Sequence, residues 1–229
     1  MKRRRSRAAG SIVLALAQGA CAVAFAGPGI DWPEVPLPPS SAGEQVTSHM
    51  KNNGVDMRAS QFATTESLAD VIEFYKRKWP DHVVNQMGGK TVIGHVEGDF
   101  MTTISLAPTG GATEGIIGTS KLPREKIEYV MGDGFDKPPG TEVFNDIIYY
   151  DTADKSRTLG MTNTLSPFQN YQYYAQRMRG QGWKLQKSRP CSMVSRSCVA
   201  MFEKDDGEKI AMTLQRQQAT TTQIVVNIE

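Results

Sequence analysis

Two short amphipathic helix candidates, each surrounded by strand-like segments, place the strongest constraint on how this chain can fold. Residues 67–79 read SLADVIEFYKRKW, and residues 166–178 read SPFQNYQYYAQRM. In both segments apolar residues recur every three or four positions, which predicts one buried helix face. A helix of about twelve residues is not stable alone in water, so each must pack its apolar face against another element.

The two candidate helices begin with the same kind of polar signal. Ser67 stands three residues before Asp70, and Ser166 stands three residues before Gln169, which is the spacing of a capping box. An offset of 99 residues superposes the two serines. The same offset aligns three further pairs: Phe74-Tyr75 with Tyr173-Tyr174, Arg58 with Arg157 and Thr65 with Thr164.

The segments around each helix also match in kind. Two strand-like runs precede each helix and four short ones follow it, separated by turns such as Asn53-Gly54, Gly88-Gly89 and Asp206-Gly207. The sequence therefore predicts an α+β fold of two tandem similar units. Each unit would pack one helix on an antiparallel sheet in the order β-β-α-β-β-β-β. The alternative is a single domain whose two halves share one sheet.

Proline-rich and glycine-rich segments set the expected boundaries. We expect a signal peptide at residues 1–26, a Pro-rich tether at 27–43, a first unit at 44–121, a linker at 122–141 and a second unit at 142–229. Five prolines in the segment 27–43 favour an extended conformation. The segment could instead be a partner-binding strap in which Trp32 is the anchor.

The N-terminus has the features of an export signal. Five basic residues within the first seven positions precede an apolar stretch that ends in Ala24-Phe25-Ala26, an A-x-A cleavage site. We therefore expect a periplasmic or secreted protein with no integral membrane span after cleavage. An alternative is a lipid anchor on Cys21, but Gln18 stands where such a signal needs a leucine-like residue.

Removal of residues 1–26 reverses the sign of the net charge. The chain has 26 Lys and Arg against 24 Asp and Glu, and the signal segment holds five of the basic residues and no acidic one. The remainder therefore has 21 basic and 24 acidic residues, a net charge of −3. Nucleic-acid binding needs clustered basic residues, so we expect no nucleic-acid partner.

Cys191 and Cys198 are the two cysteines that remain after cleavage, in the stretch CSMVSRSC. In an oxidising compartment such a pair predicts a disulfide. Two free thiols are the alternative, and a redox pair is more commonly C-x-x-C at the start of a helix. A structural zinc site normally needs four ligands, and no second cysteine pair is present.

Sequence motifs for catalysis are missing. The chain has no G-x-S-x-G, no phosphate-binding glycine loop and no H-E-x-x-H, and its histidines, His49, His82 and His95, have no metal-ligand spacing. We therefore predict no catalytic residue, no metal site and no cofactor. Whether the chain is an enzyme stays open, although these features favour a non-enzymatic role.

Tyrosines form the densest candidate surface for a partner or ligand. Tyr149, Tyr150, Tyr173 and Tyr174 combine apolar rings with hydroxyls that need hydrogen-bond partners, and Trp32 adds a second aromatic position. The simpler interpretation is that some of these rings pack a helix on its sheet.

The element order resembles that of small helix-on-sheet domains in bacterial envelope proteins, and no functional residue follows from it. We predict an exported protein of a Gram-negative-type envelope that contacts other envelope proteins as a binding or scaffold subunit. The alternatives are a small-ligand binder or hydrolase with a site between the two units, or a periplasmic inhibitor or immunity-type protein.

Overall fold

A computed structural model of the chain describes residues 29–151, 155–186 and 191–229. The predicted signal peptide at residues 1–26, with Cys21 inside it, lies outside the described residues. The predictions of export and of a lipid anchor therefore stay predictions.

The described residues form twelve strands and two helices. The strands are β1 (Ser41–Asn52), β2 (Val55–Thr64), β3 (Val83–Met87), β4 (Lys90–Glu97), β5 (Phe100–Thr109), β6 (Ala112–Lys121), β7 (Glu142–Tyr149), β8 (Ser156–Asn163), β9 (Lys184–Leu185), β10 (Ser197–Glu203), β11 (Lys209–Arg216) and β12 (Thr222–Ile228). The helices are α1 (Leu68–Lys78) and α2 (Pro167–Gly180).

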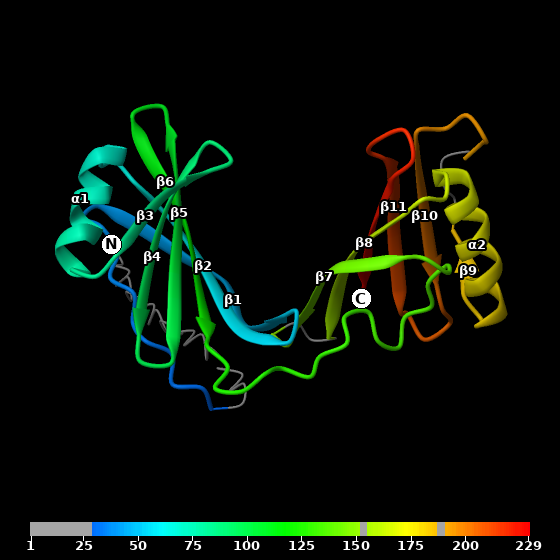
Figure 1. Cartoon of the computed structure of the whole chain (residues 1–229), viewed down its shortest axis with the longest axis horizontal. Helices are drawn as coiled ribbons and strands as arrows, with labels where there is room; N and C mark the ends of the chain where they lie inside the picture. The colour runs from blue at the N-terminus through cyan, green and yellow to red at the C-terminus, as the bar shows by residue number, and fades with distance from the viewer. Residues whose placement is uncertain (1–28, 152–154, 187–190) are drawn as a thin grey trace, which may run out of the picture.

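All twelve strands belong to one antiparallel sheet, in the order β3-β4-β5-β6-β2-β1-β7-β8-β12-β11-β10-β9. Figure 1 shows this sheet bent into two arms that stand apart and meet at β1 and β7. We call β2 to β6 with α1 the first arm, and β8 to β12 with α2 the second arm. The ladder that joins them is short, because β1 and β7 pair only through Met50–Asn52 and Ile147–Tyr149.

The predicted fold of two tandem helix-on-sheet units is wrong. Strands make up 49% of the described residues and helices 13%, and the strands of both halves form one continuous sheet. The sequence pattern reports which face of a strand is buried, but it does not report which strand pairs with which edge. The pairing of β1 with β7 therefore leaves no periodic pattern in the sequence. This pairing joins the two halves into one shared sheet, which was the alternative to two separate units.

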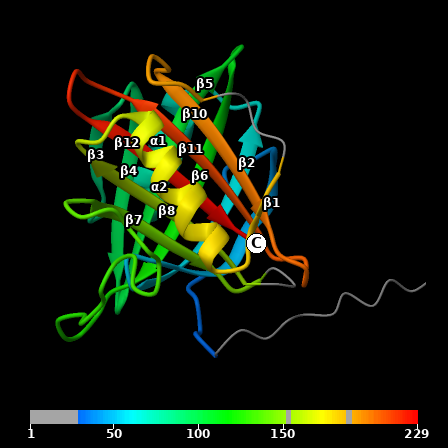
Figure 2. The same cartoon turned by 90° about the vertical axis from the view of Figure 1, so that its right-hand side faces the viewer.

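Each helix covers one face of its arm and closes a separate core. Val71 and Tyr75 of α1 pack with Ile93, Ile104 and other buried side chains of the first arm. Tyr174 and Met178 of α2 pack in a second buried cluster. Figure 2 shows α2 in front of the strands of its arm and running in nearly the same direction as they do. Burial of these apolar side chains supplies most of the stabilisation that the short helices lack by themselves.

Both helices begin where the sequence predicts. The Ser67 hydroxyl accepts a hydrogen bond from the backbone N–H of Asp70, at 3.2 Å. At the start of α2 the Ser166 hydroxyl accepts from the N–H of Gln169, and the Gln169 side chain accepts from the N–H of Ser166, which completes a capping box. These bonds satisfy donors that a helix N-terminus otherwise leaves free.

A buried ion pair stabilises the place where the arms meet. Asp146 of β7 has no exposed surface, and its carboxylate accepts hydrogen bonds from Arg157 Nε at 2.8 Å and Nη2 at 2.7 Å. The backbone N–H of Gly132 also donates to this carboxylate, at 2.7 Å. The Asn53 side chain accepts from the backbone N–H of Asp146. The turn between β1 and β2 is thereby tied directly to β7.

The N-terminal segment lies against the first arm. The Tyr75 hydroxyl donates to the Pro36 carbonyl at 3.0 Å, and the Thr64 hydroxyl donates to the Pro39 carbonyl at 2.8 Å. Val35 packs against the first core, and β1 begins at Ser41, inside the predicted tether of residues 27–43. Residues 29–40 therefore cover the helix-side face of the first arm beside α1.

Candidate binding surface between the two arms

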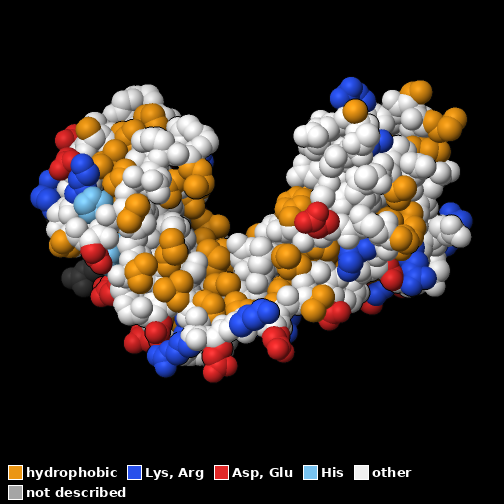
Figure 3. Space-filling model, in the orientation of Figure 1, with side chains coloured by type: hydrophobic (Ala, Val, Ile, Leu, Met, Phe, Trp, Pro, Cys, Tyr) orange, Lys and Arg blue, Asp and Glu red, His pale blue; other side chains and the backbone are white. Residues whose placement is uncertain are grey.

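The sheet face that the helices leave uncovered is the candidate binding surface. Figure 1 shows α1 and α2 on the two outer flanks, so the opposite faces of the arms look toward the space between them. Figure 3 shows this space as an open hollow, with most charged side chains on the flanks and the underside. We call the uncovered side of the sheet the inner face.

Strand alternation decides which side chains reach the inner face of the first arm. Ile93, Ile104 and Ile117 are buried toward α1, so their neighbours along each strand point the other way. Val96, Met101 and Ile116 lie an odd number of positions from these isoleucines and therefore on the opposite face, where 50%, 39% and 50% of their surfaces are exposed. Ser120 lies opposite Met101 and Ser105 lies opposite Ile116, and Thr103 is on the same face between Met101 and Ser105.

The inner face of the second arm is more polar. Met201 and Phe144 are exposed there, at 48% and 45%. Phe144 lies over Gly160, where an added Cβ would come within 2.8 Å of the Phe144 ring. The remaining positions toward the hollow are mainly amide, hydroxyl or small apolar side chains: Asn145, Thr158, Val199, Ala211, Thr213, Val225 and Asn227.

A shallow pocket of about 400 Å³ lies at the end of the inner face on the first arm. Gln61, Ala63 and Ile116 line it together with the carboxylates Glu44 and Glu114. Gln61 donates to Glu44 at 3.1 Å, so part of the polar lining is already hydrogen-bonded within the protein. The pocket adds a place where a bulky side chain of a partner could insert.

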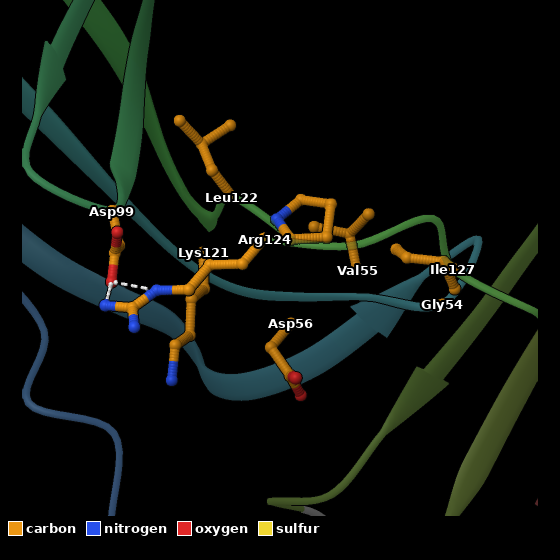
Figure 4. A pocket seen from close by; sticks show the side chains of 9 residues that line it. Gly54, Val55, Asp56, Asp99, Lys121, Leu122, Arg124 and Ile127 are labelled. Atoms are coloured by element: carbon orange, nitrogen blue, oxygen red, sulfur yellow. Dashed lines mark hydrogen bonds and ion pairs between the residues drawn. The ribbon is translucent and has the colours of Figure 1, made fainter.

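A second pocket, of about 530 Å³, is polar and lies where the first arm leads into the linker. Figure 4 shows its lining, with Arg124 reaching Asp99. The Arg124 guanidinium holds the pKa of the Asp99 carboxyl below its usual range. Asp99 is therefore a stable anion in an ion pair, which gives it no role as a proton carrier near neutral pH.

His49 and Asp56 form a close pair at the base of the arms. His49 Nε2 lies 2.8 Å from the Asp56 carboxylate, and its ring stacks on Tyr150 with centroids 4.7 Å apart. His49 Nδ1 is buried and has no hydrogen-bond partner among the described residues. Among the described residues, the contacts of this ring are therefore those with Asp56 and Tyr150.

The other histidines lie elsewhere. His95 stacks on Trp79 with centroids 4.7 Å apart, and His82 Nδ1 lies 2.6 Å from the Trp79 carbonyl. In the part of the chain that the structure describes, no group of three His, Cys, Asp or Glu side chains is placed to hold a metal ion.

The predicted aromatic surface is not a single surface. Tyr149 and Tyr150 lie at the base of the arms, whereas Tyr173 and Tyr174 belong to α2 on an outer flank. Tyr174 is completely buried in the second core, where burial raises the pKa of its hydroxyl.

Trp32 contacts the first arm. Its ring lies 5.5 Å from that of Phe100, and the Arg58 guanidinium stands 5.8 Å above it. Trp32 is therefore engaged within the chain.

Cys191 and Cys198 lie at disulfide distance, with their Cα atoms 5.4 Å apart. Cys198 is buried in the second core at the start of β10. Between the cysteines, Met193 and Val194 have 82% and 90% of their surfaces exposed. The pair therefore closes a small loop with an apolar tip.

Comparisons with known proteins give no further guidance. No protein-family model, curated protein or solved structure matches this chain. Within the described residues, neither helix has the length and hydrophobicity needed to cross a membrane.

The inner face was not predicted from the sequence, in which the tyrosines are the denser aromatic feature. The signal was present in the strand-like runs TVIGHV and EGIIGTS, in which apolar residues occupy both alternating faces. A strand with one solvated face normally alternates apolar and polar residues. These runs therefore place apolar side chains, Val96 and Ile116 among them, on the face that α1 does not cover.

Proposed function

We propose that this chain is an exported envelope protein that binds a segment of another envelope polypeptide on its inner face. In this role it is a scaffold or accessory subunit, and the inner face is its contact surface. The observation that carries the proposal is a set of exposed apolar side chains, the cross-strand pair Val96 and Met101 together with Ile116 farther along the face, on a side of the sheet that neither α1 nor α2 covers.

The chemistry of the inner face favours a polypeptide over a lipid chain. Apolar side chains alternate with hydroxyl and amide groups such as Thr103, Asn145 and Thr213. A polypeptide presents apolar side chains together with backbone donors and acceptors, so it can satisfy both kinds of group. An acyl chain would leave the hydroxyl and amide groups without partners once water is displaced.

Two observations support an extracytoplasmic location. The sequence of residues 1–26 has the basic, apolar and small-residue regions of a signal peptide. Cys191 and Cys198 lie at disulfide distance, which suits an oxidising compartment. Mass spectrometry of the protein from an envelope fraction should find Gly27 at the N-terminus and a Cys191–Cys198 peptide under non-reducing conditions.

Binding is tested by placing charge on the inner face. The double variant Met101→Asp with Ile116→Asp puts two carboxylates where we expect apolar contacts. Because both side chains are exposed, the fold should tolerate the changes, and capture of envelope proteins on the immobilised chain should fall at least about tenfold, which corresponds to about 1.4 kcal/mol.

A matched control is Val130→Asp with Met131→Asp. These residues are also exposed and apolar, but they lie in the linker between the arms. They should leave capture unchanged. Equal capture by the wild-type chain and the Met101/Ile116 double variant would contradict the proposed role of the inner face.

The pocket of about 400 Å³ beside Ile116 favours a second candidate function, the binding of a small ligand on the first arm. Native mass spectrometry of the chain isolated from envelope fractions distinguishes the two. A bound small molecule that is lost on Ile116→Asp, without loss of a captured protein, would favour the small-ligand function.

A further inference from the structure

Strand β3 (Val83–Met87) leaves one end of the sheet open. Among the described residues β3 pairs with β4 alone, and all five of its residues are exposed. The opposite end of the sheet is different. There β9 has two residues, Lys184 and Leu185, and Lys184 forms an ion pair with Asp205.

The backbone of β3 presents a defined set of hydrogen-bonding groups. Gly88 and Gly89, both at positive φ, make a two-residue turn that pairs Met87 with Lys90. A turn of this type is closed by a hydrogen-bonded pair, and such pairs alternate along an antiparallel ladder. The N–H and C=O groups of Val84 and Gln86 therefore point away from β4.

Nothing in the sequence of β3 protects this edge. Sheet edges are commonly blocked by a charged residue, a proline or a bulge. Residues 83–87 read VVNQM, without charge or proline, and their register against β4 runs without a shift. The Gln86 side chain is hydrogen-bonded to Thr91 at 2.9 Å, which leaves the main-chain groups of Gln86 accessible. The edge therefore has the properties of a strand that pairs with another strand.

We infer that β3 pairs with the β3 strand of a second copy of this chain, antiparallel about a two-fold axis at Asn85. In this register Val84 and Gln86 of each copy exchange main-chain hydrogen bonds with Gln86 and Val84 of the other. Val83 lies opposite Met87, and the two Asn85 side chains lie side by side. The pairing joins the two sheets and brings the first arms of both copies together.

The apolar side chains of β3 favour a second copy as the occupant. The register that centres on Asn85 places Val83 of one copy directly opposite Met87 of the other, and this contact occurs twice because of the symmetry. In the single chain Val83 and Met87 have 58% and 68% of their surfaces exposed. Apolar side chains at directly opposite cross-strand positions stabilise such pairs by removing this surface from water.

Sedimentation of the purified protein over a range of concentrations tests the inference. The wild-type chain should shift from monomer to dimer as its concentration rises. Val84→Lys, which places a charge on the edge, and Gln86→Pro, which removes an outward N–H, should both stay monomeric. Val130→Lys is the matched control, because Val130 is also an exposed valine but lies in the linker, and this variant should still dimerise.

A cysteine at the two-fold axis tests the register. Asn85→Cys should give a disulfide-linked dimer on a non-reducing gel, because directly opposite residues in a non-hydrogen-bonded pair lie close enough to join. Gln86→Cys should not, because Val84 lies opposite it. A wild-type chain that stays monomeric at every concentration would overturn the inference. So would a β3 edge that binds a strand of a different protein while the chain does not self-associate.

Discussion

Both arms contain the same kind of threonine-to-carbonyl hydrogen bond, but they differ in the other contacts that hold each arm together. In the first arm the fully buried Thr113 donates a hydrogen bond to the Glu66 carbonyl at 2.9 Å. In the second arm the fully buried Thr222 donates to the Leu165 carbonyl at 2.6 Å. The threonines belong to β6 and β12, and each ties its strand to the residue just before the N-cap serine of the helix. The same contact thus joins the start of each helix to the sheet.

The arginines Arg58 and Arg157 show where the arms differ. Arg58 donates to the Pro33 carbonyl and lies over Trp32, whereas Arg157 donates to the Asp133 carbonyl and to the Asp146 carboxylate. The first arm thus uses its arginine to hold the N-terminal segment. The second arm uses the equivalent residue in a buried ion pair beside the ladder that joins the arms.

The largest effect should follow from breaking this ion pair. Asp146→Ala leaves the Arg157 guanidinium, whose side chain is only 22% exposed, without its anion and the Gly132 N–H without its acceptor. Removing one partner of a buried pair costs about 3–5 kcal/mol, and the partial exposure of Arg157 favours the lower end of that range. Urea unfolding monitored by circular dichroism measures the change.

Asp136→Ala is the control for Asp146→Ala. Asp136 forms a similar hydrogen-bonded pair with Arg177, but 32% of the Asp136 side chain and 54% of the Arg177 side chain are exposed to water. Its loss should change stability little. Equal destabilisation by the two variants would mean that burial does not distinguish these pairs.

The same carboxylate predicts how stability depends on pH. Burial raises the pKa of Asp146, but hydrogen bonds from Arg157, the Gly132 N–H and Tyr129 outweigh it and hold the pKa below its usual range. A carboxyl whose pKa is lowered in the folded state stabilises that state above the unfolded pKa of about 3.9. This contribution is lost as the pH falls through the folded pKa.

Stability should therefore decline as the pH drops below about 4, and more steeply in the wild-type chain than in Asp146→Asn, which cannot titrate at this position. Urea unfolding curves between neutral pH and about pH 3 measure the difference. Parallel declines in the two proteins would show that other carboxylates dominate the acid response.

The cysteine loop should matter less and only in the second arm. Replacing Cys191 and Cys198 by serine opens a loop of about eight residues, for which chain entropy gives a loss of about 2.5 kcal/mol. Hydrogen exchange should accelerate in β10 and α2 and stay unchanged in β4 and β5, since the hairpin of the first arm turns at Gly88-Gly89 without cysteines. Equal acceleration in both arms would contradict a local role.

Local elements of the fold could be predicted from the sequence, because their causes are local. The helix caps at Ser67 and Ser166 and the turn at Gly88-Gly89 are where side-chain chemistry requires them. The joining of β1 to β7 could not be predicted. It depends on main-chain groups that every residue carries and on the hydrogen bonds between Asn53 and the backbone of Asp146, two residues that are far apart in the sequence.

The candidate site was harder to predict than the fold. Tyrosines are frequent in binding surfaces, but Tyr174 is also a good core residue, and only its packing against Phe135 and other core side chains identifies which role it has. The edge strand β3 resembles an ordinary half-buried strand in sequence. Its place at the end of the sheet is a property of the topology alone.

The smallest and most specific test compares the two buried tyrosines, Tyr75 and Tyr174. Both have no exposed surface, but the Tyr75 hydroxyl donates to the Pro36 carbonyl, whereas the Tyr174 hydroxyl has no partner among the described residues. Tyr75→Phe should therefore destabilise the protein by about 1 kcal/mol, because it removes a hydrogen bond and leaves a carbonyl without its donor. Tyr174→Phe removes a buried polar group that gains nothing from folding, so it should be neutral or stabilise the protein by up to about 1 kcal/mol.

Thermal or urea unfolding of the Tyr75→Phe and Tyr174→Phe variants gives the sign of each change directly. Opposite signs would show that the N-terminal segment, through Pro36, is part of how the first arm is held together, whereas the second arm closes over α2 without such a bond. Equal losses would mean that Tyr174 has a hydrogen-bond partner of its own and that the arms are closed in the same way.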